Sequence, residues 1–164
     1  MSQHPVPARP TPAFVGASWI ALVIAVGSFA VGLSNAELEL SDKGFFGTAL
    51  LLGLFSAIAL QKSVRDRAEG IPVTAIFLGL SWAMVLTSLV LVTTGLTNAP
   101  LELSEKGFFG LGFAMALFAV VAVQKNVRDL AATATASAAH NDTDGPASVW
   151  APSETQPTPP TSGR

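Results

Sequence analysis

Long apolar stretches alternate with short polar segments along the whole chain. No Asp, Glu, Lys or Arg occurs in residues 10–36, 44–61, 70–101 and 107–124. Each stretch approaches or exceeds the length of about 20 residues that an α-helix needs to cross a bilayer. Residues 20–24 and 89–92 lack the alternation of polar and apolar faces that a soluble amphipathic helix shows. The pattern therefore predicts an all-α polytopic membrane protein with four transmembrane helices.

The chain also contains an internal repeat. Residues 32–66 recur as residues 95–129 at a constant offset of 63, with 21 of 35 positions identical. The same register aligns Trp19 with Trp82, and both lie several residues inside an apolar stretch, near the predicted cytoplasmic boundary, as in an interfacial aromatic belt. Each copy contains two apolar stretches, so each copy is predicted to be a helical hairpin. The second hairpin enters the membrane in the same direction as the first, which makes the repeats parallel.

These boundaries divide the chain into two repeats and two tails. The first two-helix repeat is expected over residues 13–67 and the second over residues 68–130. The tails, residues 1–12 and 131–164, are rich in Pro, Ala, Thr and Ser. Such segments bury too little apolar surface to offset their ordering entropy, so both tails are predicted to be disordered.

Composition narrows the classes of function. Hydrophobic residues make up 50% of the chain and charged residues only 12%, against about 25% charged in a typical soluble domain. The chain has no Cys, and both His residues lie in the tails, so no disulfide, thiolate metal site or cofactor is expected. No base, nucleophile pair or metal set lies at membrane depth. We therefore expect neither an enzyme nor a nucleic-acid partner.

Lys and Arg are distributed unequally between the two sides of a four-helix topology. The side that holds both termini carries Arg9, Lys62, Arg65, Arg67, Lys125, Arg128 and Arg164. The opposite side carries only Lys43 and Lys106. Cytoplasmic loops carry the excess of Lys and Arg in membrane proteins. Both termini are therefore predicted to be cytoplasmic.

A motif with the pattern S-[DE]-K-G-F-F precedes the second apolar stretch of each copy. Ser followed by an acid is typical of a helix N-cap with a favourable charge in the first turn, which would make Ser41 and Ser104 structural caps. Alternatively, Glu39, Lys43 and their counterparts line an outer vestibule that binds a polar solute or a partner loop. The candidate outer-loop and cap residues are Glu39, Ser41, Lys43, Gly44, Glu102, Ser104, Lys106 and Gly107.

A second motif, Q-K-x-V-R-D, ends each copy on the cytoplasmic side. Its cations complement the negative end of a helix and meet anionic headgroups. That interpretation does not explain the recurring Gln and Asp, which favour a specific cytoplasmic binding or partner surface, with Asp66 pairing with Arg128 and Asp129 with Arg65. The candidate residues on this surface are Gln61, Lys62, Arg65, Asp66, Gln124, Lys125, Arg128 and Asp129.

Small residues recur at a spacing of four in the second helix of each copy. In lipid, such stripes let helix backbones approach closely, because association depends on packing rather than on the hydrophobic effect. The two second helices are therefore expected at the centre of the bundle. The candidate packing residues are Ala49, Gly53, Ala57, Gly112 and Ala116.

The repeated N-A-x-L-x-L-S-[DE]-K-G-F-F-G segment and its closing Q-K-x-V-R-D resemble the YiaA/YiaB family of bacterial inner-membrane proteins. The resemblance covers about residues 13–130. It implies a location in the inner membrane and an architecture of paired helices, and it brings no activity, substrate or catalytic residue. Pro100 stands where the first copy has Glu37, which weakens any role for that acidic position.

Two classes of function remain open. The first is a non-enzymatic structural or accessory protein that packs against lipid, a second copy of itself or another membrane protein. The second is a small transporter or channel, with a hydroxyl-lined path through Thr87, Ser88, Thr93 and Thr94. Coupled transporters usually place a titratable group at mid-membrane. The four apolar stretches contain none, which favours the accessory role.

Overall fold

The structure is a computed structural model that describes residues 10–143. It consists of four helices, which are α1 (Pro12–Asn35), α2 (Leu40–Ala68), α3 (Ala75–Asn98) and α4 (Leu103–Thr143). Each helix is long and apolar enough to cross a membrane, and the mean hydropathy of its most apolar 18-residue segment lies between 1.7 and 2.3. The predicted all-α fold with four transmembrane helices is confirmed.

The first helix of each repeat starts at the same kind of cap. Thr11 Oγ1 accepts a hydrogen bond from the backbone N–H of Phe14, and Thr74 Oγ1 accepts one from Phe77, both at 3.3 Å. Pro12 follows Thr11 in the first turn, where backbone N–H groups have no partner within the helix, so the N–H that Pro lacks costs no hydrogen bond. The two caps are 63 residues apart, so the repeat extends to the first residues of α1 and α3.

The second helices do not start at the predicted serine caps. Helix α2 begins at Leu40, and its N-cap is Glu39, whose backbone is extended with φ −63° and ψ 155°. Ser41 therefore lies inside the first turn, and Ser104 has the same place in α4, which begins at Leu103. The prediction that these serines are N-caps is wrong, because the backbone turns from extended to helical before it reaches them.

Carboxylates take over part of this capping role. Asp42 and Glu105 lie in the first turns of α2 and α4, where the helix dipole favours negative charge. Glu105 Oε2 accepts a hydrogen bond of 2.9 Å from the backbone N–H of Glu102. In a capping box the N3 side chain accepts a hydrogen bond from the N-cap backbone N–H, and this bond is present here although the N-cap residue is Glu102 rather than Ser or Thr.

Helix α4 continues far beyond the second repeat. Residues 131–143 were expected to be disordered, and the structure shows them as the last turns of α4. Five of the eight residues 131–138 are Ala, which has the highest helix propensity of all residues. The low apolar content of this segment was therefore a poor guide to its local structure. Residues 1–9 and 144–164 of the predicted tails lie outside the described residues.

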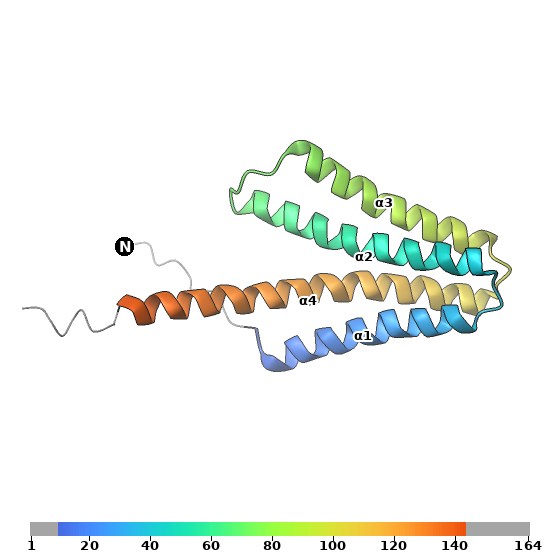
Figure 1. The fold of residues 1–164 in the computed structure, drawn as a ribbon, viewed down its shortest axis with the longest axis horizontal. Helices are drawn as coiled ribbons and strands as arrows, with labels where there is room; N and C mark the ends of the chain where they lie inside the picture. The colour runs from blue at the N-terminus through green and yellow to red at the C-terminus, as the bar shows by residue number, and fades with distance from the viewer. Residues whose placement is uncertain (1–9, 144–164) are drawn as a thin grey trace, which may run out of the picture.

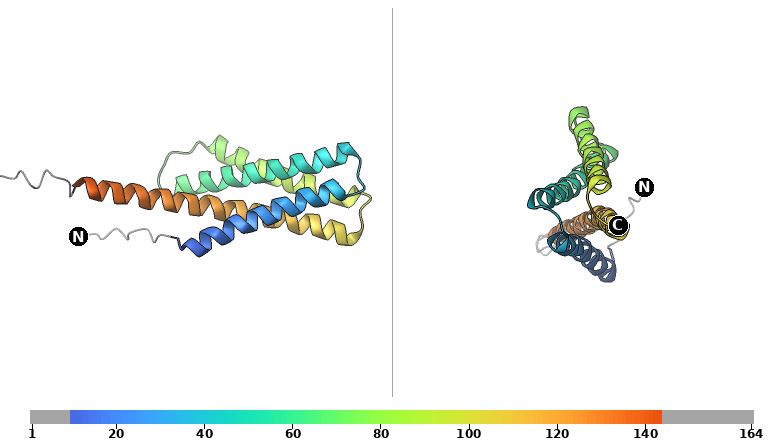
Figure 2. Two further views of the ribbon diagram at one scale, coloured as in Figure 1. Left: turned by 60° about the horizontal axis from the view of Figure 1, so that its bottom comes forward. Right: turned by 90° about the vertical axis from the view of Figure 1, so that its right-hand side faces the viewer.

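The four helices form a row in the order α3, α2, α4, α1 (Figures 1 and 2). Helix α1 packs mainly against α4 and α3 mainly against α2, whereas α1 and α2 have only limited contact. The connections 36–39 and 99–102 lie at one end of the bundle, and the connection 69–74 lies at the other. Each repeat is thus a hairpin by connectivity, but the main packing partner of every helix belongs to the other repeat.

Aromatic side chains fill the centre of the bundle. The rings of Phe46 and Phe109 stack at 6.2 Å with an interplanar angle of 15°. Phe29 packs edge-on against Phe109 at 5.2 Å, and Phe113 is also buried. Many large apolar side chains outside this cluster are exposed, Phe55 among them. Such extensive apolar exposure suits helices that face lipid tails rather than water.

Candidate functional site

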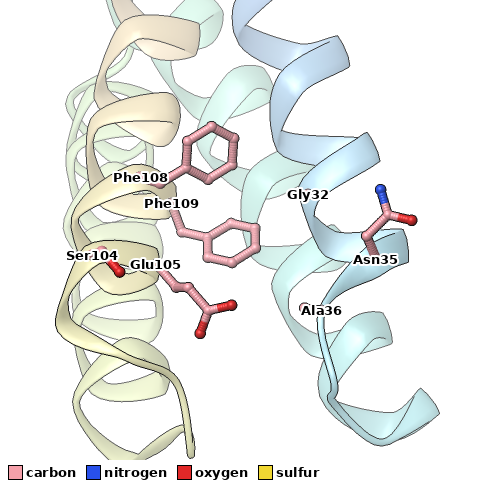
Figure 3. A pocket seen from close by; sticks show the side chains of 7 residues that line it. All are labelled: Gly32, Asn35, Ala36, Ser104, Glu105, Phe108 and Phe109. Carbon is pink, nitrogen blue, oxygen red and sulfur yellow. The ribbon is translucent and has the colours of Figure 1, made fainter.

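A cavity of about 380 Å³ lies between α1 and α4 at the end of the bundle that holds the connections 36–39 and 99–102. Phe108, Phe109 and Glu105 project from α4 toward α1, as Figure 3 shows. Gly32 and Asn35 form part of the opposite wall. The cavity therefore combines the end of the first helix of one repeat with the start of the second helix of the other.

A second cavity of about 260 Å³ repeats this arrangement between α3 and α2. Gly95 and Asn98 of α3 face Asp42, Phe45 and Phe46 of α2. Each of these residues lies 63 positions from a residue that lines the first cavity. The repeated sequence therefore builds one site twice, and each site requires both repeats.

Glycine allows the close approach that forms these sites. A Cβ atom at Gly32 would lie 2.6 Å from Cε1 of Phe108, and one at Gly95 would lie 2.7 Å from Cε1 of Phe45. Carbon atoms in contact normally stay about 3.5–4.0 Å apart, so a larger residue would displace the ring. By contrast, a Cβ at Gly44 or Gly107 would meet nothing within 4 Å, and neither glycine is required for helix packing.

Each recurring lysine bridges the connection between the two helices of its repeat. Lys43 Nζ donates a hydrogen bond of 2.9 Å to the carbonyl of Ser34, and Lys106 Nζ donates one of 3.2 Å to the carbonyl of Thr97. Both acceptors lie in the last turn of the preceding helix, where backbone carbonyls are unpaired and the dipole favours a cation. The lysines therefore stabilise the ends of α1 and α3 and are not among the residues that line the two cavities.

The polar groups available in the two cavities are few. Each contains one carboxylate, one amide and one hydroxyl beside aromatic rings. Within residues 10–143, no group of three or more His, Cys, Asp or Glu side chains is placed to hold a metal ion. The cavities can therefore accept a hydrogen-bonding or apolar group.

The second motif forms ion pairs at the opposite end of the bundle. Lys62 pairs with Asp66 at 2.6 Å, and Lys125 pairs with Asp129 at 2.8 Å. Both are contacts between residues four positions apart on one helix. Asp66 and Asp129 therefore do not pair across the repeats as predicted, because a lysine one turn away on the same helix already holds each of them.

Glu69, the C-cap of α2, forms an ionic contact between α2 and α4 at this end. Its Oε1 accepts a hydrogen bond of 2.8 Å from Nε of Arg65 in α2 and one of 3.4 Å from Nη2 of Arg128 in α4. The internal repeat does not point to this role, because position 132, the counterpart of Glu69 in the second repeat, is Ala.

Two amide side chains form hydrogen bonds between helices near the same end. Gln61 Nε2 donates a hydrogen bond of 3.4 Å to the carbonyl of Val121 in α4. Asn126 Nδ2 donates one of 2.9 Å to Oγ of Ser18 in α1, and both side chains are buried. The side-chain oxygens of Gln61, Gln124 and Asn126 are buried without a hydrogen-bond partner among residues 10–143.

The small-residue stripe lies where the central helices meet. Ala49, Gly53 and Ala116 are buried, and a Cβ at Gly53 would come within 2.8 Å of the Phe113 ring of α4. Gly112 lies near Phe29 of α1 instead, and Ala57 lines a groove at the basic end. The stripe therefore contributes to both the α2–α4 and the α1–α4 contacts.

Of the candidate outer-loop and cap residues, only Ser104 is among the residues that line the two cavities. Four uncharged lining residues that were not candidates are Gly32, Asn35, Gly95 and Asn98. All four are identical between the copies, which was a usable signal. It was overlooked because these residues end an apolar stretch and carry no charge.

Comparison with known proteins agrees with this duplicated architecture. The model of the yiaA/B two-helix domain matches residues 14–66 and again residues 77–129. The chain belongs to the YiaA/B family. It is accordingly a multi-pass inner-membrane protein.

Two relatives of this YiaA/B protein differ in length. It is 51% identical over 119 residues to the inner membrane protein YiaA of Escherichia coli. This match covers 73% of this chain and 82% of YiaA. It is 39% identical over 62 residues to the uncharacterized membrane protein YubF of Bacillus subtilis. This match covers 37% of this chain and 71% of YubF. The YubF match is as long as one repeat, and that relative is too short for two. No solved structure matches the chain significantly.

Proposed function

We propose that this protein is a non-enzymatic structural or accessory component of the inner membrane. The observation that carries the proposal is the aromatic cluster between the two central helices. Phe46 and Phe109 stack there, and Phe29 and Phe113 pack beside them. Close-packed rings leave no polar path along this contact, because ions and polar solutes need water or polar groups around them.

The positions of the hydroxyl groups also favour an accessory role over transport. Ser88 is buried, and its Oγ donates to the carbonyl of Val85 in its own helix. Thr87 and Thr93 are exposed on α3, and Thr94, which is also exposed, lines the cavity at the end of the α2–α3 contact. Hydroxyls that bond to their own backbone are common in membrane helices and mark no solute path.

The test compares solute permeability with partner recovery. Vesicles reconstituted with the full chain are expected to be no more permeable to water-soluble neutral solutes, such as glycerol, than protein-free vesicles. Extraction in native lipid discs is expected to recover another membrane protein in a near-stoichiometric amount. Saturable permeability that depends on the protein and falls in the Ser88→Val variant would overturn the accessory role.

We infer that both chain ends are cytoplasmic. The start of α1, the end of α4 and the α2–α3 connection lie at one end of the bundle (Figure 1). The basic residues of both Q-K-x-V-R-D motifs belong to that end, whereas Lys43 and Lys106 lie at the other. An excess of Lys and Arg favours the cytoplasmic side.

Cysteine labelling tests this orientation, since the chain has no Cys of its own. A Thr97→Cys variant should react with a membrane-impermeant thiol reagent outside intact cells. An Ile71→Cys variant in the α2–α3 connection should react only after the cells are opened. Both positions are exposed, so the opposite labelling pattern would reverse the orientation.

A further inference from the structure

A groove of about 570 Å³ opens between α2, α3 and α4 at the basic end of the bundle. Its apolar surface includes Leu60 and Val64 of α2 and Trp82 and Val85 of α3. Trp82 lies about two turns inside α3, at the depth where a Trp side chain meets the region between headgroups and acyl chains. The groove is thus large enough and apolar enough for part of a lipid chain.

Three cations converge on this groove from two helices. Arg65 of α2 and Arg128 of α4 both contact Glu69 Oε1, so one carboxylate holds the two guanidinium groups close together. Lys125 of α4 also lines the groove and is paired with Asp129. Three positive charges thus face two negative charges. Each guanidinium has five N–H donors, and Glu69 engages at most two on each arginine.

A buried acceptor lies deeper in the same groove. Gln61 lines the groove, and its Nε2 donates to the carbonyl of Val121. Its Oε1 is buried and has no hydrogen-bond partner among residues 10–143. A buried acceptor without a partner is unfavourable, and a hydroxyl group that reaches this oxygen would supply the missing donor.

We propose that this groove binds one anionic glycerophospholipid. The phosphate binds at Arg65 and Arg128, a hydroxyl of the glycerol headgroup donates to Gln61, and the start of an acyl chain packs against Trp82. Charge complementarity selects an anionic lipid over a zwitterionic one, because a choline group would add positive charge beside three cations. This site goes beyond the proposed accessory role and does not depend on it.

The internal repeat supplies a matched control for the charge. Lys125 and its counterpart Lys62 are both largely exposed and are each paired with an Asp four residues later. Lys125 lines the groove, whereas Lys62 does not contribute to it. Loss of either lysine removes the same charge from the same end of the protein, so a difference between the two variants reports the groove itself.

The experiment measures lipid binding to the full-length purified protein by native mass spectrometry after delipidation. Dioleoyl phosphatidylglycerol should bind as one retained molecule, and dioleoyl phosphatidylcholine should bind more weakly. Lys125→Ala should weaken phosphatidylglycerol binding about fivefold, the effect of about one cation at a membrane surface. Lys62→Ala should leave binding unchanged.

Three outcomes would overturn the proposal. Equal effects of Lys125→Ala and Lys62→Ala would show diffuse attraction rather than a site. Equal binding of phosphatidylcholine would exclude selection by charge. Displacement of phosphatidylglycerol by millimolar inorganic phosphate would identify a free anion as the ligand. Thermal unfolding of both variants verifies that they fold, and the assay contains no other protein, so its result is independent of any accessory partner.

Discussion

Replacement of Gly53 by Ala tests how closely the central helices approach. The new Cβ would lie 2.8 Å from Cζ and 3.0 Å from Cε2 of Phe113, and 3.1 Å from Cδ2 of Leu117. All three distances are shorter than the 3.5–4.0 Å or so of ordinary carbon contacts. Phe113 is only 3% exposed, so its ring has little free space into which to move. The helices must separate, or the surrounding aromatic cluster must shift.

The size of the effect follows from two opposing contributions. Ala is more favourable than Gly inside a helix by about 1 kcal/mol, whereas overpacking a close contact costs about 1–3 kcal/mol. Gly53→Ala should therefore lower the free energy of unfolding by up to about 2 kcal/mol. Gly47→Ala in the same helix is the control, because its Cβ would meet nothing within 4 Å. That variant should be neutral or more stable than the original protein.

Unfolding of the purified protein in mixed micelles by titration with sodium dodecyl sulfate, followed by far-ultraviolet circular dichroism, gives the comparison. The midpoint should fall for Gly53→Ala and stay unchanged or rise for Gly47→Ala. Gly53→Leu should lower it further, because a larger side chain must displace more of Phe113. Equal midpoints for the two alanine variants would refute the close approach of α2 and α4 at this residue.

Three further predictions concern the contacts between and within the repeats. Asn126→Ala should cost about 0.6–1.7 kcal/mol in the same titration, because it removes a hydrogen bond between helices, and an unchanged midpoint would contradict this. Fragments 1–70 and 71–164, expressed together, should purify as a one-to-one complex, since the main partner of each helix lies in the other repeat; recovery of the fragments separately would count against the exchanged packing. Ser41→Ala should change stability by less than about 0.5 kcal/mol, whereas Glu105→Ala should cost about 0.5–1.5 kcal/mol through its lost hydrogen bond, and thermal unfolding that reverses this order would restore serine as the cap.

Two of the predictions that the structure contradicts concern the partners of polar residues. Ser41 has the residue type of an N-cap, but the backbone becomes helical at Leu40, and a pattern of residue types locates such a boundary only to within one or two positions. Asp66 has the charge to pair with Arg128, but Lys62 lies one helical turn away and meets it first. In each case the sequence was compatible with several interactions, and the distances between the groups in the folded chain determine which one forms.

The site formed by the two cavities could be predicted only in small part. The S-[DE]-K-G-F-F motif marked the right segment, but the acids that line the cavities are Asp42 and Glu105 rather than the predicted Glu39 and Glu102. The opposite walls contain Gly32 and Gly95. These glycines matter because each leaves space for a phenylalanine ring of the facing helix. Glycine has no side chain whose chemistry would indicate a role. Its part in packing is recognised only when the neighbouring residue in the folded structure is known.

The sequence by itself determined that the protein has four membrane helices in two parallel copies. Length and apolarity are properties of each segment alone, and they suffice because a helix satisfies its own backbone hydrogen bonds in lipid. Only the tertiary structure decided that α1 packs against α4 and α3 against α2. Both copies carry the same glycine and the same phenylalanines, so the motif fits a partner within its own repeat or in the other. Lipid tails are as apolar as the helices, and the choice between these partners therefore depends on the fit of ring against glycine in three dimensions.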